Sequence, residues 1–243
     1  MIAPAPVQDA PPDPLYAAFV TMPVPGYEDA TLSLPGGPSK ERRPVVVALH
    51  GLRGRADWTC HVARELFDTR AFVLCPAGTP LPTKTQTDRE RPRYTLPEPR
   101  RLGLEIAAGL AALEARYAAS VDVESPVLYG HSLGAIFGAT LALAHPATWQ
   151  RVVLSEGGYS AWASPGAQEF VKLGGRRVLF ACGTRTCDDG AKVAARTLKA
   201  AGAEADVGYA AGAGHRSWGP IVDVMQARID WLLAGDARFG GAS

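Results

Sequence analysis

From residue 44 onward, short apolar runs alternate with amphipathic segments of helical length, and this alternation constrains the fold more than any other feature. The runs are rich in β-branched residues, as in strands that are covered on both faces. The expected strands are Pro44–His50, Ala71–Cys75, Pro126–Gly130, Arg151–Ser155, Arg177–Ala181 and Ala205–Ala210. The expected helices are Trp58–Asp68, Arg101–Tyr117, Leu133–His145, Ala191–Ala201 and Ile221–Leu233. We therefore predict an α/β fold with a mainly parallel sheet and helices on both faces.

The start of the chain has a different composition. Met1–Pro14 contains five prolines and no apolar region of the kind found in an intact signal peptide, so we expect a flexible tail. Ala17–Met22 and Ala30–Leu34 are expected to pair antiparallel at the edge of the sheet. We expect a single domain over residues 15–235, a usual size for one α/β domain.

The charge balance excludes several classes of partner. The chain has 25 basic and 24 acidic residues and a net charge of +1, which gives no reason to expect nucleic acid or an anionic membrane. No apolar run approaches the roughly 18 residues that a membrane span needs. We expect a monomer without a membrane span.

Four cysteines carry information about both metals and redox state. They form no Cys-x-x-Cys pair, and the histidines do not lie at zinc-ligand spacing, so we expect neither a metal nor a cofactor. Cys60 begins a predicted helix and Cys75 ends the next strand, which places both on one rim of the sheet. Cys182 ends a later strand, five residues before Cys187. These positions allow the disulfides Cys60–Cys75 and Cys182–Cys187, which favour a periplasmic or secreted location over the cytoplasm. The alternative is four reduced, buried cysteines.

The pentapeptide Gly130-His131-Ser132-Leu133-Gly134 lies between a predicted strand and a predicted helix. A tight turn there holds Ser132 in a strained conformation, and glycines on both sides let the backbones approach. The serine then lies at a helix N-terminus, where N–H groups favour developing negative charge. The other interpretation is an ordinary turn with a serine cap.

With this pentapeptide, residues 44–233 resemble the α/β-hydrolase superfamily, and the resemblance implies an α/β-hydrolase fold with Ser132 as nucleophile. A second mark is His50-Gly51-Leu52 at the end of the first long strand. The resemblance implies that the backbone N–H groups of Leu52 and Leu133 form an oxyanion hole. His50 is expected to brace this turn.

The third mark is Gly212-Ala213-Gly214-His215, directly after the last predicted strand. Glycines before a histidine suit a loop that reaches back over the sheet to the serine. The resemblance therefore implies His215 as general base. His131 is adjacent to the serine in sequence but is expected to point elsewhere.

Two candidates remain for the acid that would orient His215. Superfamily members usually take it from the loop that here contains Asp188, but the expected places hold Arg185 and Thr186. Glu156 follows an apolar strand directly, and some members take their acid from that strand. A carboxylate there would need a partner, which His215 would supply. We favour Glu156 and keep Asp188 as the alternative.

The connection after Glu156 is short, so we expect no large cap domain and an open site. Its walls are expected to include Trp58, Tyr159, Trp162 and Trp218, with the proline-rich loop Pro76–Arg101 beside them. The resemblance implies hydrolysis of small-molecule carboxylic esters through an acyl-enzyme on Ser132. The alternatives are amide, thioester or lactone cleavage by the same residues, and a non-catalytic binding protein on the same scaffold.

Overall fold

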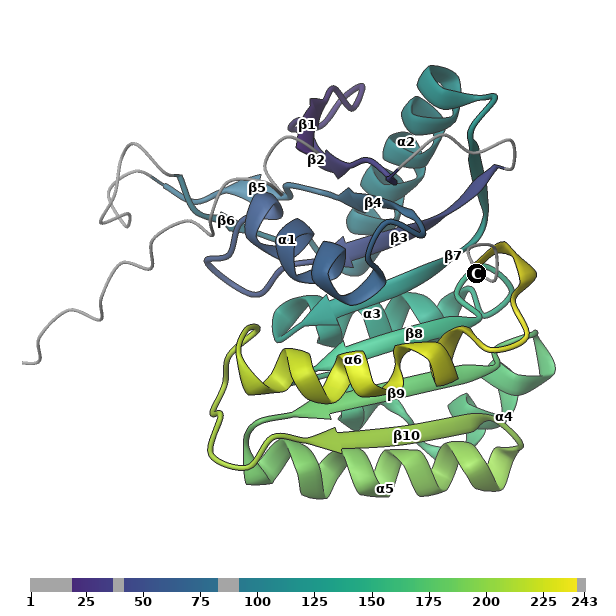
Figure 1. Ribbon diagram of the computed structural model, residues 1–243. Helices are drawn as coiled ribbons and strands as arrows, with labels where there is room; N and C mark the ends of the chain where they lie inside the picture. The colour runs from purple at the N-terminus through teal and green to yellow at the C-terminus, as the bar shows by residue number, and fades with distance from the viewer. Residues whose placement is uncertain (1–18, 37–41, 83–91, 240–243) are drawn as a thin grey trace, which may run out of the picture.

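A computed structural model describes residues 19–36, 42–82 and 92–239, in which eight strands form one twisted sheet (Figure 1). The expected tail 1–14 lies outside these residues. In spatial order the strands are β1 (Phe19–Met22), β2 (Ala30–Ser33), β4 (Phe72–Cys75), β3 (Arg43–Leu49), β7 (Val121–His131), β8 (Arg151–Ser155), β9 (Arg177–Cys182) and β10 (Glu204–Tyr209). The parallel strands of this sheet are β4, β3, β7, β8, β9 and β10. Strand β2 pairs antiparallel with both β1 and β4. Because β7, β8, β9 and β10 are parallel, the loops that follow them meet at one edge of the sheet.

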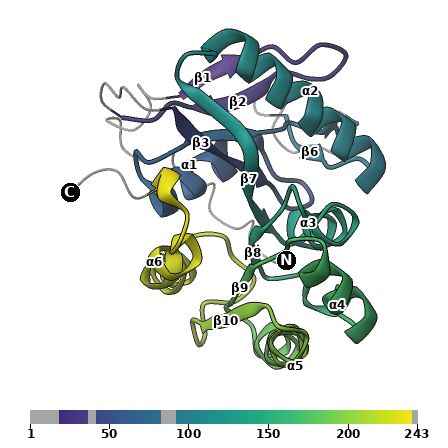
Figure 2. The same ribbon diagram turned by 90° about the vertical axis from the view of Figure 1, so that its right-hand side faces the viewer.

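Helices cover both faces of the sheet, as expected (Figure 2). One layer holds α1 (Ala56–Phe67) and α6 (Pro220–Leu233), and the other holds α2 (Pro99–Tyr117), α3 (Leu133–Ala144), α4 (Ser164–Lys172) and α5 (Arg185–Ala201). Alternate residues of one strand enter opposite layers: Val46 and Tyr129 pack on the side of α1 and α6, whereas Val47 and Leu128 pack on the other. This explains why the strands are apolar throughout.

The predicted fold class is confirmed. Some helices and strands begin or end at other residues than predicted, because local hydrogen bonds, and not the hydrophobic pattern, set those ends. Helix α5 begins at Arg185 instead of Ala191, because the Thr184 hydroxyl caps it by accepting a hydrogen bond from the Cys187 amide. Helix α4 was not predicted; it is short and buries only Ala167 and Phe170. No large cap domain interrupts the connection from β8 to β9.

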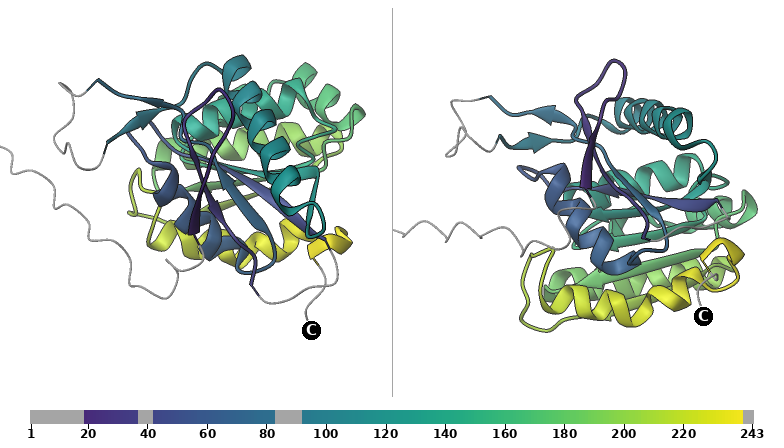
Figure 3. Two further views of the ribbon diagram at one scale, coloured as in Figure 1. Left: turned by 90° about the horizontal axis from the view of Figure 1, so that it is seen from above. Right: turned by 45° about the horizontal axis from the view of Figure 1, so that its top comes forward.

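The segment 76–101, expected to be a loop, contains regular structure in 76–82 and 92–101, while 83–91 lies outside the described residues. Strands β5 (Thr79–Pro80) and β6 (Tyr94–Thr95) form an antiparallel hairpin that projects from the body of the molecule (Figure 3). Helix α2 begins at Pro99, where proline suits the first turn and the Glu98 carboxylate accepts hydrogen bonds from the next two free amides. An isolated bridge between Gly54 and Tyr94 joins the hairpin to the turn after β3.

Both expected disulfides are present. Cys60 is bonded to Cys75 and Cys182 to Cys187, and all four side chains are buried. Each bond joins the end of a strand to a neighbouring helix. Within the described residues, none of the helices combines the length and the apolar character that crossing a membrane requires.

Replacing Leu128 with alanine is expected to lower the free energy of unfolding by about 2–5 kcal/mol, because the side chain is fully buried between β7 and α3 and its loss leaves a cavity. The matched control is Leu104→Ala on α2, where the leucine is 64% exposed and the cost should stay within about 0.5 kcal/mol. Urea unfolding of both variants measures the difference. Equal losses would show that Leu128 does not pack as described.

Candidate active site

Ser132 lies in the turn between β7 and α3 with an unusual backbone conformation. Its φ and ψ are 54° and −115°, a region that residues with a side chain rarely adopt. The two flanking glycines are required by space: a Cβ atom on Gly130 would collide with the Gly134 carbonyl, and one on Gly134 with the Leu49 carbonyl. The turn therefore presents the Ser132 hydroxyl at the edge of the sheet, at the start of a helix.

Three side chains from three loops form a hydrogen-bonded row at this edge. The Nε2 atom of His215 lies 2.8 Å from the Ser132 hydroxyl oxygen. On the other side of the ring, Nδ1 lies 3.1 Å from Oε2 of Glu156. The His215 side chain is 55% exposed, whereas that of Glu156 is 1% exposed. The row thus runs from an accessible hydroxyl through an imidazole to a buried carboxylate.

The turn after β9 supplies most of the hydrogen bonds to the Glu156 carboxylate. The Gly183 amide and the Thr184 amide both donate to Oε1, the latter at 3.0 Å. The Thr184 hydroxyl donates to Oε2 at 2.9 Å, the same oxygen that faces His215. These donors satisfy a charge that would otherwise be costly to bury. Sequence analysis gave no role to Gly183 or Thr184, although both follow a buried strand directly, which is the available signal.

Asp188, the alternative acid, has a different partner. Its side chain is fully buried in the first turn of α5, and Oδ2 lies 2.7 Å from Nζ of Lys192. The structure therefore pairs His215 with Glu156 and Asp188 with Lys192. The N-terminus of α5 is capped by Thr184 and not by Asp188.

The turn that contains Leu52 lies beside the serine. A Cβ atom on Gly51 would lie 3.2 Å from Cβ of Ser132, so this turn touches the turn that carries Ser132. Leu133 is the first residue of α3, where an N–H group has no partner within the helix. Nε2 of the buried His50 lies 2.9 Å from the Ala77 carbonyl oxygen and Nδ1 lies 2.8 Å from that of Gly51, so the ring bridges the turn and the segment after β4. Burial lowers the pKa of His50.

His131 packs close to His215 without reaching the serine. The two rings are 5.3 Å apart at their centroids, and His131 Nδ1 lies 3.3 Å from the Ser155 hydroxyl. Burial, and secondarily the neighbouring His215, lowers the pKa of His131 to about 3. His131 is therefore neutral at physiological pH and adds no positive charge beside His215.

The four aromatic residues expected to line the site have different environments. Trp58 and Trp218 are 39% and 41% exposed, on the segments that follow the Leu52 turn and His215 respectively. Tyr159 is partly buried and its ring packs against Gly190. Trp162 is 3% exposed and packs edge-on against Phe170 and Phe180 in the core. Trp162 is thus a core residue rather than a wall of the site, because the turn after β8 directs its ring inward.

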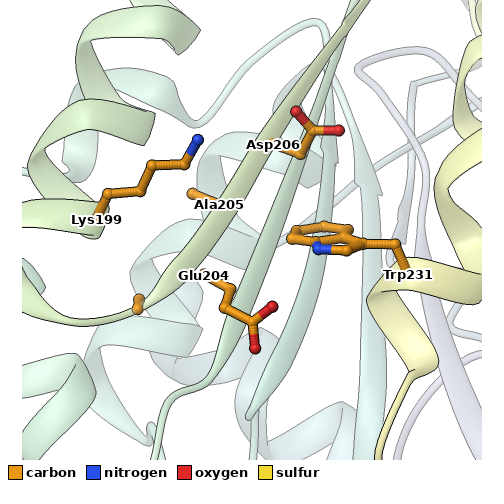
Figure 4. Close-up of a pocket in the computed structure, with 6 residues that line it drawn as sticks. Lys199, Glu204, Ala205, Asp206 and Trp231 are labelled. Atoms are coloured by element: carbon orange, nitrogen blue, oxygen red, sulfur yellow. The ribbon is translucent and has the colours of Figure 1, made fainter.

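Two surface hollows of the described residues lie away from this row. One, of about 450 Å³, is lined by Lys199, Glu204, Asp206 and Trp231 near the amino end of β10 (Figure 4). Its acids are paired with arginines: Glu204 with Arg177 at 2.7 Å and Asp206 with Arg228 at 3.0 Å. The other, of about 460 Å³, lies between α2 and α3 and is mostly apolar. Neither is lined by Ser132.

One cluster outside the hydrogen-bonded row resembles a metal site in composition. Glu156, Cys182 and Cys187 bring a carboxylate and two sulfurs within 4.8 Å of one another. The two sulfurs are bonded to each other and therefore offer no thiolate to a metal. In its present oxidation state the cluster is a carboxylate beside a disulfide.

Comparisons with known proteins identify the fold. The chain matches a thermostable esterase with a TM-score of 0.60 at 20% identity, covering 90% of this chain and 63% of that one. It matches a dienelactone hydrolase from Anabaena variabilis at 0.58 and 17%, covering 88% and 95%. It matches a fluorophosphonate-binding serine hydrolase from Staphylococcus aureus at 0.58 and 12%, covering 88% and 96%. No protein-family model and no curated protein matches the sequence. The chain has the α/β-hydrolase fold that these solved structures share.

The low pKa of His131 predicts a loss of stability in acid. Between its folded-state pKa of about 3 and the ordinary value near 6.5, the unfolded chain binds a proton that the folded chain does not. Stability therefore falls as the pH drops from about 7.5 to 5, and His131→Asn should lose about 1–2 kcal/mol less than the wild type over this range. Urea unfolding at both pH values measures it, with His145→Asn as an exposed control. Equal losses in wild type and His131→Asn would contradict a neutral His131.

Proposed function

We propose that this protein is a serine hydrolase that cleaves small carboxylic esters through an acyl-enzyme on Ser132. The proposal rests above all on one observation, the row of hydrogen bonds from Ser132 through His215 to Glu156. A nucleophile, a base and an orienting acid in this order are what acyl transfer requires. The match to structures described as esterases supports the same class of reaction.

The proposed reaction has two halves, acylation of Ser132 and hydrolysis of the acyl-enzyme. The same three side chains take part in both. His215 Nε2 takes the proton of the Ser132 hydroxyl as the oxygen attacks the ester carbonyl, and it then gives that proton to the leaving alcohol. Water next attacks the acyl-enzyme and loses a proton to His215, which gives that proton to the Ser132 oxygen as the acid is released and Ser132 is restored. Glu156 accepts a hydrogen bond from Nδ1–H, which fixes the reactive tautomer and stabilises the imidazolium.

The developing oxyanion would be stabilised by the backbone N–H groups of Leu52 and Leu133. Both segments lie beside the serine, and donors of this kind are each worth roughly 3–4 kcal/mol in the transition state. We further propose that Trp58 and Trp218 contact the substrate, because both are exposed, Trp58 in the first turn of the helix that follows the Leu52 turn and Trp218 on the loop that carries His215. Tyr159 remains a weaker candidate because Gly190 already covers part of its ring.

Related acyl transfers would use the same residues. A dienelactone hydrolase and an S-formylglutathione hydrolase are among the proteins with this fold, so lactone and thioester cleavage are alternatives to test, as is amide cleavage. A non-catalytic binding protein would differ from all of these in one property: its serine would not react with a fluorophosphonate.

Replacing Ser132 with alanine should reduce hydrolysis of nitrophenyl esters to below about one-hundredth of the wild-type rate, because the nucleophile accounts for far more than that factor. The fold should be retained, since the side chain is small and at the surface edge. Wild-type protein should be labelled by a fluorophosphonate probe and the variant should not. An unlabelled wild type would indicate a binding protein, and residual ester turnover in the variant would exclude Ser132.

Glu156→Gln should lower turnover of the same ester by orders of magnitude, because the neutral amide loses the charge that stabilises the imidazolium and can favour the wrong tautomer of His215. Asp188→Asn is the matched control: it breaks the pair with Lys192 and costs stability, but should leave most of the turnover. Steady-state kinetics of both variants decide between the acids. A crippled Asp188→Asn beside an active Glu156→Gln would reverse the assignment.

A further inference from the structure

The six residues from Cys182 to Cys187 form a turn closed by a disulfide at the end of β9. Cys182 is the last residue of that strand, and Cys187 lies in the first turn of α5. Within the turn, the Thr184 hydroxyl accepts from the Cys187 amide at 3.4 Å. The disulfide and this hydrogen bond thus hold the same few residues in place.

This turn contacts the acid of the proposed triad with three donors. They come from two neighbouring residues, Gly183 and Thr184, and they contact both oxygens of the Glu156 carboxylate. Because the carboxylate is almost fully buried, water cannot replace these donors if the turn moves. The position of the carboxylate therefore depends on the position of the turn.

The same turn also contacts the loop that carries the base. The Gly214 amide donates to the Gly183 carbonyl at 3.2 Å, and the Ala210 amide donates to the Cys182 carbonyl at 2.8 Å. A Cβ atom on Gly183 would collide with the Gly214 carbonyl, so the two segments are in close contact. The turn after β9 is therefore packed between Glu156 and the residue that precedes His215.

We propose that the disulfide-closed turn 182–187 positions Glu156 against His215, with Thr184 as the positioning residue. This inference rests on the proposed function, because the row it aligns is the proposed catalytic one. Misplacement of a catalytic group by about 1 Å can cost roughly 100-fold in rate. Loss of the Cys182–Cys187 bond should consequently reduce catalysis more than it reduces binding of substrate.

The second disulfide provides a matched control. Cys60 and Cys75 are also fully buried and also join a helix to a strand end, but Cys60 packs near the carbonyls of Thr31 and Val73, toward the other edge of the sheet. We expect Cys182→Ala/Cys187→Ala to lower kcat on a nitrophenyl ester by roughly 10–100-fold with KM within about twofold. Cys60→Ala/Cys75→Ala should lower the melting temperature but keep kcat within about twofold.

A second pair of variants leaves the disulfide intact. Thr184→Val removes the hydroxyl with little change in shape, whereas Thr184→Ser retains it. Thr184→Val should lower kcat by roughly tenfold, and Thr184→Ser should restore most of it. If the cysteine variant fails to fold, this pair still tests the proposal: equal kcat values for Thr184→Val and wild type would overturn it.

The His215 imidazole offers a readout that does not require ester hydrolysis. Its Nδ1 atom lies 3.1 Å from Oε2 of Glu156, so the NMR resonance of the Nδ1 proton reports this hydrogen bond directly. If the turn positions Glu156, this resonance should shift in Cys182→Ala/Cys187→Ala and in Thr184→Val, and stay at its wild-type position in Thr184→Ser and in the Cys60→Ala/Cys75→Ala control.

The two measurements separate the proposals. An Nδ1 proton resonance of His215 that is the same in all variants would overturn the role of the turn, even if kcat fell. A shifted resonance in a protein that hydrolyses no ester would support the role of the turn and refute the proposed function.

Discussion

The buried carboxylate of Glu156 is the constraint on which the arrangement of the site depends. Removing such a charge from water costs several kcal/mol unless hydrogen bonds compensate for it. Here the compensation comes from the turn after β9 and from His215, so three separate loops must meet at one point. Parallel strands make this possible, because β8, β9 and β10 deliver their following loops to the same edge of the sheet.

Ser132 and Glu156, two residues at this edge, have a strained backbone conformation and still form hydrogen bonds of the sheet. Ser132 and Glu156 both have a φ of 54°, a conformation that costs on the order of 1–3 kcal/mol outside glycine. Their amides nevertheless continue the strand pairing: Ser132 donates to the Ser155 carbonyl at 2.8 Å and Glu156 to the Ala181 carbonyl at 2.9 Å. The ladder thus extends one residue past each strand before the chain turns, and the strain is offset by the sheet.

Much of the fold and of the turn at Ser132 could be predicted from the sequence, because the local sequence patterns there are each typical of a single structure. Buried parallel strands are apolar throughout, and the glycines around Ser132 are required by contacts within a single turn, so both were recognisable. The start of α5 at Arg185 was not, since it depends on the Thr184 cap, and Trp162 looked like a site residue although it belongs to the core. Thr184 itself was missed because its partner, Glu156, lies 28 residues earlier, and a contact of that separation leaves no periodic signal.

The order of the strands relates the position of the proposed acid, Glu156, to the residues found in the turn after β9. Ser132 follows β7, Glu156 follows β8, and the disulfide-closed turn follows β9, so neighbouring strands provide the serine, the carboxylate and the donors in that order. If the acid were in the turn after β9, that turn would have to present a side chain to His215. With Glu156 as the proposed acid, directly after β8, this turn presents backbone amides and a hydroxyl instead, which favours the Gly183–Thr184 pair found there over an aspartate. Under this proposal, an aspartate at the places held by Arg185 and Thr186 would be unfavourable, because it would put a second carboxylate close to the buried Glu156.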